Sequence, residues 1–240
     1  MVTIGPPKKP GGGKYAKRED DLSDYVHRQL IGYIGLSLPF VLYLLAALRN
    51  DPDQATRWGL LDSISAYYYT GAVAAFVGLL VALSLFLFSY QGYGNENHRW
   101  DRLIAGTAGF AALGVAFFPT TAPTSPIPPT WIARTVWLHY ASAVVLFLSF
   151  AVFCLWLFRM KKAGEVVTPE KRVRNHIYVS CGIAILIGIA WTGLNAAQHR
   201  HIFWPESVCV VAFAFSWLTK GRAGRSIKSK ARAVLKKGSS

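Results

Sequence analysis

Four residues of this 240-residue chain combine a reactive side chain with a place at the edge of a long apolar run: Asp62, Ser65, His139 and Glu206. His139 and Glu206 stand just inside such runs, where an ionisable group is costly and is normally kept for a function. We therefore take these four as the candidate catalytic residues, with Glu206 as a base or a metal ligand. A hydrogen bond between His139 and Glu206 that merely joins two helices is the alternative.

Hydroxyl and amide side chains accompany these candidates and predict a substrate-binding function. The segment before the second apolar run contains Ser63, Tyr68 and Thr70, and the segment before the sixth contains Asn195 and Gln198. Such groups suit hydrogen bonds to a lipid headgroup, a sugar or a phosphate. The alternative is structural, since a hydroxyl could cap the second helix and tyrosines favour the headgroup level of a membrane.

Three histidines on the same side of the apolar runs suggest a metal centre. His139, His199 and His201, together with Asp62, could supply ligands for zinc, which in catalytic sites takes three protein ligands and leaves one position for an activated water. A solvated loop is the alternative environment for His199 and His201, and no HExxH spacing is present. The three cysteines have no CxxC spacing and are expected to be buried packing residues.

Six apolar runs surround these polar residues and predict an all-α fold of transmembrane helices. The runs cover residues 29–48, 70–90, 103–119, 136–158, 177–194 and 205–218. A helix needs about 20 mostly apolar residues to cross roughly 30 Å of hydrocarbon. The runs are apolar on all sides rather than amphipathic, which excludes a soluble globular protein. We expect a polytopic helical bundle with six spans.

Positive charge is divided unequally between the two sides of these runs and predicts their orientation. Of the 26 Lys and Arg residues, twenty-two fall in the termini and in alternate loops, and four fall in the remaining loops. Cytoplasmic loops of membrane proteins carry the excess of Lys and Arg. We therefore expect a multi-pass protein of the cell membrane with both termini in the cytoplasm and the candidate site on the exoplasmic face.

The charge distribution also predicts how the chain is organised and what it meets. Residues 1–28 are expected to form a flexible basic cytosolic arm, residues 29–219 the membrane domain, and residues 220–240 a basic cytosolic tail. Ile227, Ala231, Val234 and Leu235 share one helical face in that tail, as in an amphipathic helix on anionic lipid of the inner leaflet. Because the net charge of +14 flanks the apolar runs, nucleic acid is not expected as a partner.

Short motifs along the chain resemble a known membrane family. They are SISAYYYT before the second run, FFPT at the end of the third, LHYASA at the start of the fourth and SWLTKG at the end of the sixth. In layout, residues from about 25 to 221 resemble bacterial six-helix proteins of the Frag/DRAM/Sfk group, which includes a factor that remodels GPI-anchor lipids. The resemblance implies lipid-related work at a membrane, with His139 as the position carried over.

The chain is also distantly similar to seven-helix membrane hydrolases of the ceramidase type, which use a Ser, an Asp and several His around zinc. It departs from them in its six predicted spans and in lacking their final His-x-x-x-His. This difference puts hydrolysis by the same arrangement in doubt.

Two classes of function follow from these patterns. In the first, the protein binds or modifies a lipid or another amphiphile at the exoplasmic face; as an enzyme it would be a lipid hydrolase or have an acyltransferase-like activity. In the second, it is a noncatalytic channel, transporter or membrane assembly scaffold. Glycines in the third and fifth runs allow close helix contact, either within one chain, which we favour, or in a homo-oligomer.

Overall fold

The chain is all-helical in the computed structural model. The structure describes residues 13–49, 59–92, 98–121, 130–160 and 167–222. Within these ranges the elements are α1 (Gly13–Arg49), η1 (Ser65–Tyr69), α2 (Val73–Phe88), α3 (His98–Phe117), α4 (Thr130–Leu155), η2 (Leu157–Arg159), α5 (Pro169–Ala197) and α6 (Phe203–Lys220). The two η elements are short 3-10 helices, and no strand occurs among the described residues. The prediction of an all-α fold is confirmed.

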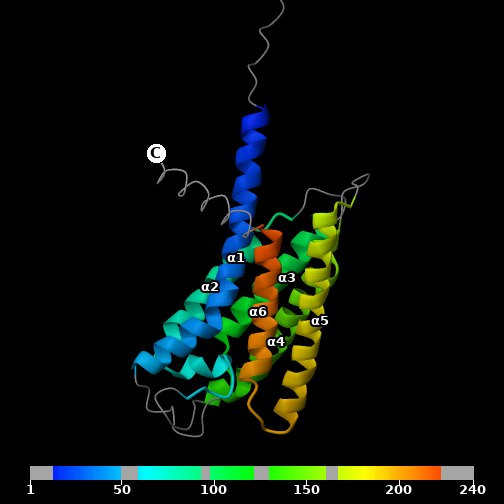
Figure 1. The fold of residues 1–240 in the computed structure, drawn as a ribbon. Coiled ribbons are helices and arrows are strands. Elements are labelled where there is room, and N and C mark those ends of the chain that lie inside the picture. The colour runs from blue at the N-terminus through cyan, green and yellow to red at the C-terminus, as the bar shows by residue number, and fades with distance from the viewer. Residues whose placement is uncertain (1–12, 50–58, 93–97, 122–129, 161–166, 223–240) are drawn as a thin grey trace, which may run out of the picture.

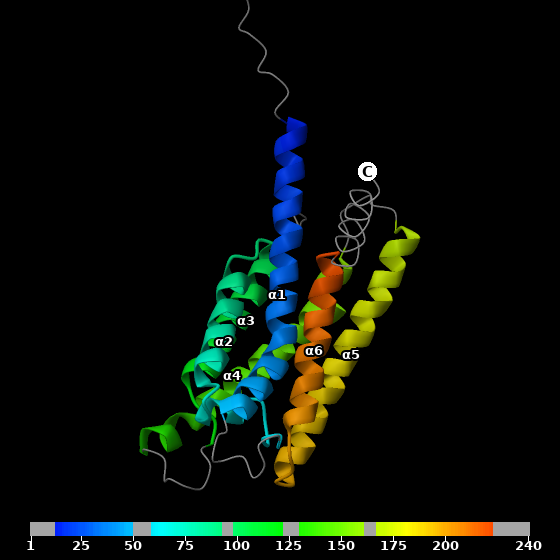
Figure 2. The ribbon, with the colours of Figure 1, turned by 60° about the vertical axis from the view of Figure 1, so that its left-hand side comes forward.

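The six α-helices lie side by side (Figures 1 and 2). Each helix contacts the next one along the chain, and α6 contacts α1. In addition, α6 contacts α4, so that this last helix touches α1, α4 and α5. Each predicted apolar run falls on one of the six helices.

Three stretches among the described residues are long and apolar enough to cross a membrane: Ser23–Leu48, Arg134–Arg159 and Pro169–Ala197. The helix Val73–Phe88 is apolar but shorter. Large apolar side chains also face outwards, such as Phe110, which is 71% exposed, and Phe40, which is 64% exposed. An outer surface of this kind is compatible with a membrane protein.

The first helix is longer than the apolar run that predicts it. α1 begins at Gly13, well before residue 29, and contains Pro39. The helix changes direction along its length (Figure 1). A proline inside a helix removes one backbone hydrogen bond and crowds the preceding turn, which accounts for such a bend. Residues 1–12 and the basic tail beyond residue 222 lie outside the described part of the chain.

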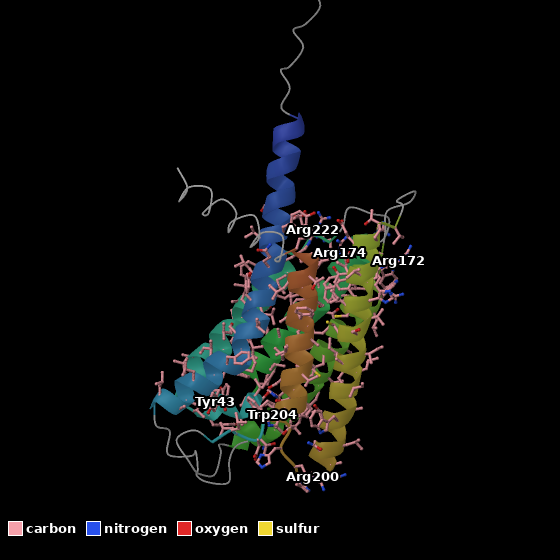
Figure 3. The ribbon with its side chains drawn as sticks, viewed as in Figure 1. Tyr43, Arg172, Arg174, Arg200, Trp204 and Arg222 are labelled. Carbon is pink, nitrogen blue, oxygen red and sulfur yellow. The ribbon has the colours of Figure 1, made fainter. Side chains whose placement is uncertain are left out.

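The two ends of the molecule differ in chemistry, and we name them for what they hold. The η1 end contains residues 59–72, the start of α4 and the connection from α5 to α6. The basic end contains the start of α5 and the end of α6. Figure 3 shows Arg172, Arg174 and Arg222 at the basic end and Arg200 and Trp204 at the η1 end.

Aromatic side chains fill the core toward the basic end. The ring of Trp217 is fully buried and lies 4.9 Å from that of Tyr90, 5.0 Å from Phe158 and 5.3 Å from Phe153, between ring centres. These edge-on contacts join α4, η2 and α6 to the end of α2. These contacts therefore hold the end of α6, and the residues directly after it, in a fixed position.

Candidate functional site

The segment between residues 62 and 72 is held in shape by its own hydroxyl groups. The backbone N–H of Ala66 donates to Ser63 Oγ at 2.9 Å, at the start of η1. Thr70 Oγ1 donates to the carbonyl of Tyr67 at 2.8 Å and accepts from the N–H of Ala72 at 3.1 Å. These hydroxyls satisfy backbone groups that the helix ladders leave open. Ser63 and Thr70 therefore make local structural contacts, although no side chain caps α2, whose N-cap residue is Ala72.

His139 on α4 meets Ser65 on η1. His139 Nε2 lies 3.0 Å from Ser65 Oγ, and His139 Nδ1 lies 2.7 Å from the carbonyl oxygen of Phe118. A carbonyl only accepts, so in the neutral ring Nδ1 carries the proton and Nε2 accepts from the serine hydroxyl. His139 is 2% exposed and Ser65 is 7% exposed. The structure thus joins two predicted catalytic residues in a buried pair.

Glu206 in the first turn of α6 meets the same segment through its backbone. Its Oε2 accepts a hydrogen bond from the N–H of Ile64 at 2.7 Å. Beside it, the N–H groups of Ile202 and Phe203 donate to the carbonyl of Asp62 at 2.6 and 2.8 Å. The start of α6 is therefore tied to residues 62–64 by three hydrogen bonds.

His139 and Glu206 converge on adjacent positions of one segment rather than on each other. His139 contacts Ser65, and Glu206 contacts Ile64. In the described part of the chain no hydrogen bond joins the two side chains directly. The two side chains are linked only through residues 64 and 65 of the segment between them.

The remaining polar candidates form an exposed group at the connection from α5 to α6. The carboxylate of Asp62 contacts His201 Nδ1, and the two side chains are 80% and 75% exposed. Asn195 Nδ2 donates to the carbonyl of His201 at 2.8 Å. Gln198 and His199 are exposed, and His199 occupies a left-handed turn conformation with φ of 52°. The Asp62 carboxylate is therefore exposed, whereas Ser65 and His139 are buried.

Binding of zinc, as predicted from the sequence, requires three ligand side chains that can coordinate the same ion. Among the described residues, no group of three or more His, Cys, Asp or Glu side chains is placed to share an ion. His139 has both ring nitrogens in hydrogen bonds to Ser65 and Phe118. Zinc binding through His139, His199 and His201 stays a prediction.

The tyrosines before α2 serve mainly to pack this end. Tyr68 is half-buried, and its ring centre lies 5.3 Å from that of Tyr69 and 6.1 Å from that of Phe76. The Tyr69 hydroxyl donates to the carbonyl of Thr120 at 2.6 Å, which joins η1 to the end of α3. These contacts account for the packing of Tyr68 and Tyr69, whereas the buried hydroxyl of Tyr67 has no hydrogen-bond partner among the described residues.

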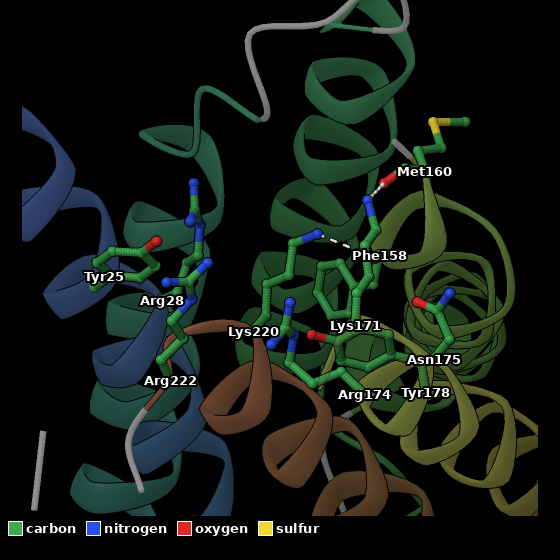
Figure 4. Close-up of a pocket in the computed structure, with 10 residues that line it drawn as sticks. All are labelled: Tyr25, Arg28, Phe158, Met160, Lys171, Arg174, Asn175, Tyr178, Lys220 and Arg222. Atoms are coloured by element: carbon green, nitrogen blue, oxygen red, sulfur yellow. Dashed lines mark hydrogen bonds between the residues drawn. The ribbon is translucent and has the colours of Figure 1, made fainter. Parts of the chain in front are cut away.

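A pocket at the basic end is the feature that the sequence did not predict (Figure 4). It is lined by Tyr25, Arg28, Phe158, Met160, Lys171, Arg174, Asn175, Tyr178, Lys220 and Arg222. A local signal exists, because Arg174 and Tyr178 are four residues apart and share one face of α5. Nothing in the sequence indicates that this face of α5 lies next to α1 and the end of α6.

The resemblance of the short motifs to the Frag/DRAM/Sfk group stays a prediction. No family model, curated protein or solved structure matches this chain.

Proposed function

We propose that this chain is a six-span membrane protein that modifies a lipid or another amphiphile at the η1 end, with both termini in the cytoplasm. The observation that carries the proposal is the 3.0 Å contact between Ser65 Oγ and His139 Nε2, with the ring oriented by the carbonyl of Phe118. A hydroxyl beside an imidazole whose other nitrogen is held by a third group is the arrangement of an activated nucleophile.

The chemistry would be the transfer of an acyl group. His139 Nε2 takes the proton of the Ser65 hydroxyl while Oγ attacks the ester carbonyl of the lipid. The imidazolium then gives that proton to the oxygen of the departing alcohol, which leaves an acyl-serine. Attack by water on this ester, with the proton again passing through His139, frees a fatty acid and regenerates the serine; attack by a second alcohol gives acyl transfer.

A noncatalytic role is the second candidate, and the burial of the site favours it. Ser65 and His139 are almost fully buried, and residues 62–64 are tied to α6 by backbone hydrogen bonds. In this case the polar side chains hold the segment against α4 and α6. The protein would then be a channel, a transporter or an assembly scaffold whose shape depends on these contacts of residues 62–65 with α4 and α6.

A fluorophosphonate probe distinguishes the two candidates, because it bonds covalently to an activated serine oxygen and releases fluoride. The purified full chain is placed in lipid nanodiscs and exposed to the probe. For an enzyme, we expect labelling of the wild type and its loss in Ser65→Ala and in His139→Ala. The matched control is Ser207→Ala, since the Ser207 hydroxyl is buried and donates to the carbonyl of Phe203 in its own helix, at 2.7 Å.

Each result has a clear meaning. Labelling that persists in Ser65→Ala contradicts Ser65 as the nucleophile. The noncatalytic role is supported if the wild type does not react and if Ser65→Ala and His139→Ala unfold at a lower temperature than Ser207→Ala.

A further inference from the structure

The pocket at the basic end concentrates positive charge at one point. Five cationic side chains line it: Arg28, Lys171, Arg174, Lys220 and Arg222. They come from α1, from α5 and from the end of α6, and Figure 4 shows them around a common space. Among the described residues no carboxylate lines this pocket. The composition is that of a site for an anion.

Close packing of two helices places two of these cations. Gln29 Nε2 donates to the carbonyl of Gly221 at 2.7 Å. A Cβ on Gly221 would lie 2.8 Å from Gln29 Cγ and 3.0 Å from the carbonyl oxygen of Tyr25, so a larger residue here would push α1 and the end of α6 apart. The chain after α6 therefore lies directly against α1, with Lys220 and Arg222 on either side of the contact.

Neutral groups hold two of the lysines in place. Lys220 Nζ donates to the carbonyl of Phe158 at 3.1 Å, and Lys171 Nζ donates to the carbonyl of Met160 at 3.3 Å. A carbonyl at this distance orients an ammonium group without neutralising its charge.

Aromatic rings orient the charges as well. Lys220 Nζ lies 5.1 Å from the ring centre of Phe158, and Arg222 Cζ lies 4.9 Å from that of Tyr25. These are cation–π distances, and a ring face attracts a cation without neutralising it. The aromatic rings thus help to hold Lys220 and Arg222 in position without cancelling their charge.

Two carboxylates lie near the cluster and are outnumbered by its cations. Asp24 accepts from Arg28 Nη2 at 3.2 Å, and its own side chain is 60% exposed. Asp101 on α3 is buried, and its charge acts on Lys220. Among the described residues, Arg28, Lys171, Arg174 and Arg222 outnumber these two carboxylates even when Lys220 is neutral, and like charges close together repel one another. A bound anion would remove that repulsion.

A polar atom of the pocket also points to a ligand. The side-chain oxygen of Asn175 is buried and accepts no hydrogen bond within the part of the chain that the structure describes. Buried polar atoms are almost always paired with protein, water or ligand. A hydroxyl group next to the anion would supply the missing donor.

We propose that this pocket binds the phosphate group of a phosphate ester, carried either by a membrane lipid or by a soluble molecule. Arginine side chains match phosphate oxygens in pairs, and the pocket volume of about 50 Å³ suits a small headgroup rather than an acyl chain. The site lies at the end of the molecule opposite Ser65 and does not depend on the proposed chemistry there. Basic pockets between membrane helices are typical binding sites for lipid headgroups.

Two exposed tryptophans mark the level of this site. Trp100 and Trp156 are 47% and 44% exposed, and their ring centres lie 5.7 Å apart. They belong to the first turn of α3 and to the residue that follows α4, both at the basic end. Tryptophan is enriched where a membrane meets water, which is where a lipid phosphate lies.

The test uses the delipidated full chain and two probes. Native mass spectrometry measures binding of phosphatidylglycerol against phosphatidylcholine, whose choline cation the pocket should repel. Calorimetry measures binding of glycerol 3-phosphate. Arg174→Gln removes a hydrogen bond between charged groups. We therefore expect it to bind the probe that the wild type prefers about tenfold or more weakly. The matched control is Arg172→Gln, which removes the same charge from an exposed position of the same helix.

The outcomes separate the two sources of phosphate. Preference for phosphatidylglycerol identifies a lipid headgroup, and binding of glycerol 3-phosphate identifies a soluble ester; either supports the site when Arg172→Gln binds as the wild type does. Arg222→Gln, which lies beyond α6, serves as the second variant if Arg174→Gln does not fold. Equal losses in the pocket variants and in Arg172→Gln, or no binding of either probe by the wild type, would overturn the proposal.

Discussion

Glu206 and Ile64 are joined by a hydrogen bond of 2.7 Å from the backbone N–H of Ile64 to Glu206 Oε2. Both residues are buried, and Ile64 precedes η1. A buried backbone N–H requires an acceptor, and here a side chain of another helix supplies it. This need of the backbone accounts for a carboxyl group at the start of α6 without invoking catalysis.

Replacement of Glu206 tests that explanation. Glu206→Leu leaves the N–H of Ile64 buried without its acceptor, so we expect a loss of about 1–3 kcal/mol of folding free energy. Glu206→Gln keeps an oxygen acceptor and should lose less. Thermal unfolding of both variants in the same detergent measures the difference. Equal stability of the Leu and Gln variants would contradict the role given to this bond.

Two glycines of α5 provide a matched test of the contact between α5 and α6. A Cβ on Gly188 would contact Cys209 Sγ and lie 3.1 Å from the carbonyl oxygen of Pro205, whereas a Cβ on Gly193 would meet nothing within 4 Å. We expect Gly188→Ala to cost about 1–3 kcal/mol through overpacking. Gly193→Ala should be neutral or stabilise by up to about 1 kcal/mol, because alanine favours helix. Similar unfolding temperatures for the two variants would show that close packing at Gly188 does not stabilise the pair of helices.

Anion binding at the basic end should depend on pH through Lys220. Burial, and next the positive charge of Arg28, lower the pKa of Lys220 to about 7; Asp101 opposes the shift, and Lys171 and Arg174 add to it. An anion binds the protonated amine better, so the affinity for sulfate should fall as the pH rises through about 7. Sulfate is the probe because its own charge is constant there.

The control for this pH dependence is Lys220→Arg, since a guanidinium stays charged throughout the range. Its affinity for sulfate should change less with pH than that of the wild type. The groups that face Lys220 in the wild type are the same in the variant: Arg28, Asp101, Lys171, Arg174 and Tyr178. An unchanged slope in Lys220→Arg would assign the pH dependence to one of these groups instead.

The orientation in the membrane can be measured at the two ends of one helix. Arg172 and Gln198 are exposed, at the start of α5 and directly after its end, and the three native cysteines are buried. On intact cells we expect an impermeant maleimide to label Gln198→Cys and to label Arg172→Cys only after permeabilisation. The reverse pattern would invert the proposed topology.

The helices could be predicted from the apolar runs, whereas hydropathy alone does not show where they begin. The apolar run at 177–194 marks only the middle of α5, which begins at Pro169. The Thr168 hydroxyl accepts from the N–H of Lys171 at 3.2 Å and caps this start. The polar turns that follow extend the helix beyond the apolar residues, and hydropathy does not detect them.

The location of the candidate site could be predicted, but not which of its side chains contact one another. The alternation of charge places Ser65, His139 and Glu206 on one side of the predicted membrane. Whether His139 meets Ser65 or Glu206 depends on how each helix is rotated about its axis, and uniformly apolar helices give no pattern for that rotation. The basic pocket was missed for a similar reason, since a lysine or arginine next to an apolar run looks the same whether it faces lipid headgroups or a pocket.

The last helix is a single rigid element that holds a residue of each site. Glu206 lies in its first turn and Lys220 is its last residue, so about 21 Å of helix separates the two residues. A small sliding of α6 along its axis would alter the bond to Ile64 and the position of Lys220 together. A displacement at the η1 end would thereby be transmitted to the pocket at the basic end.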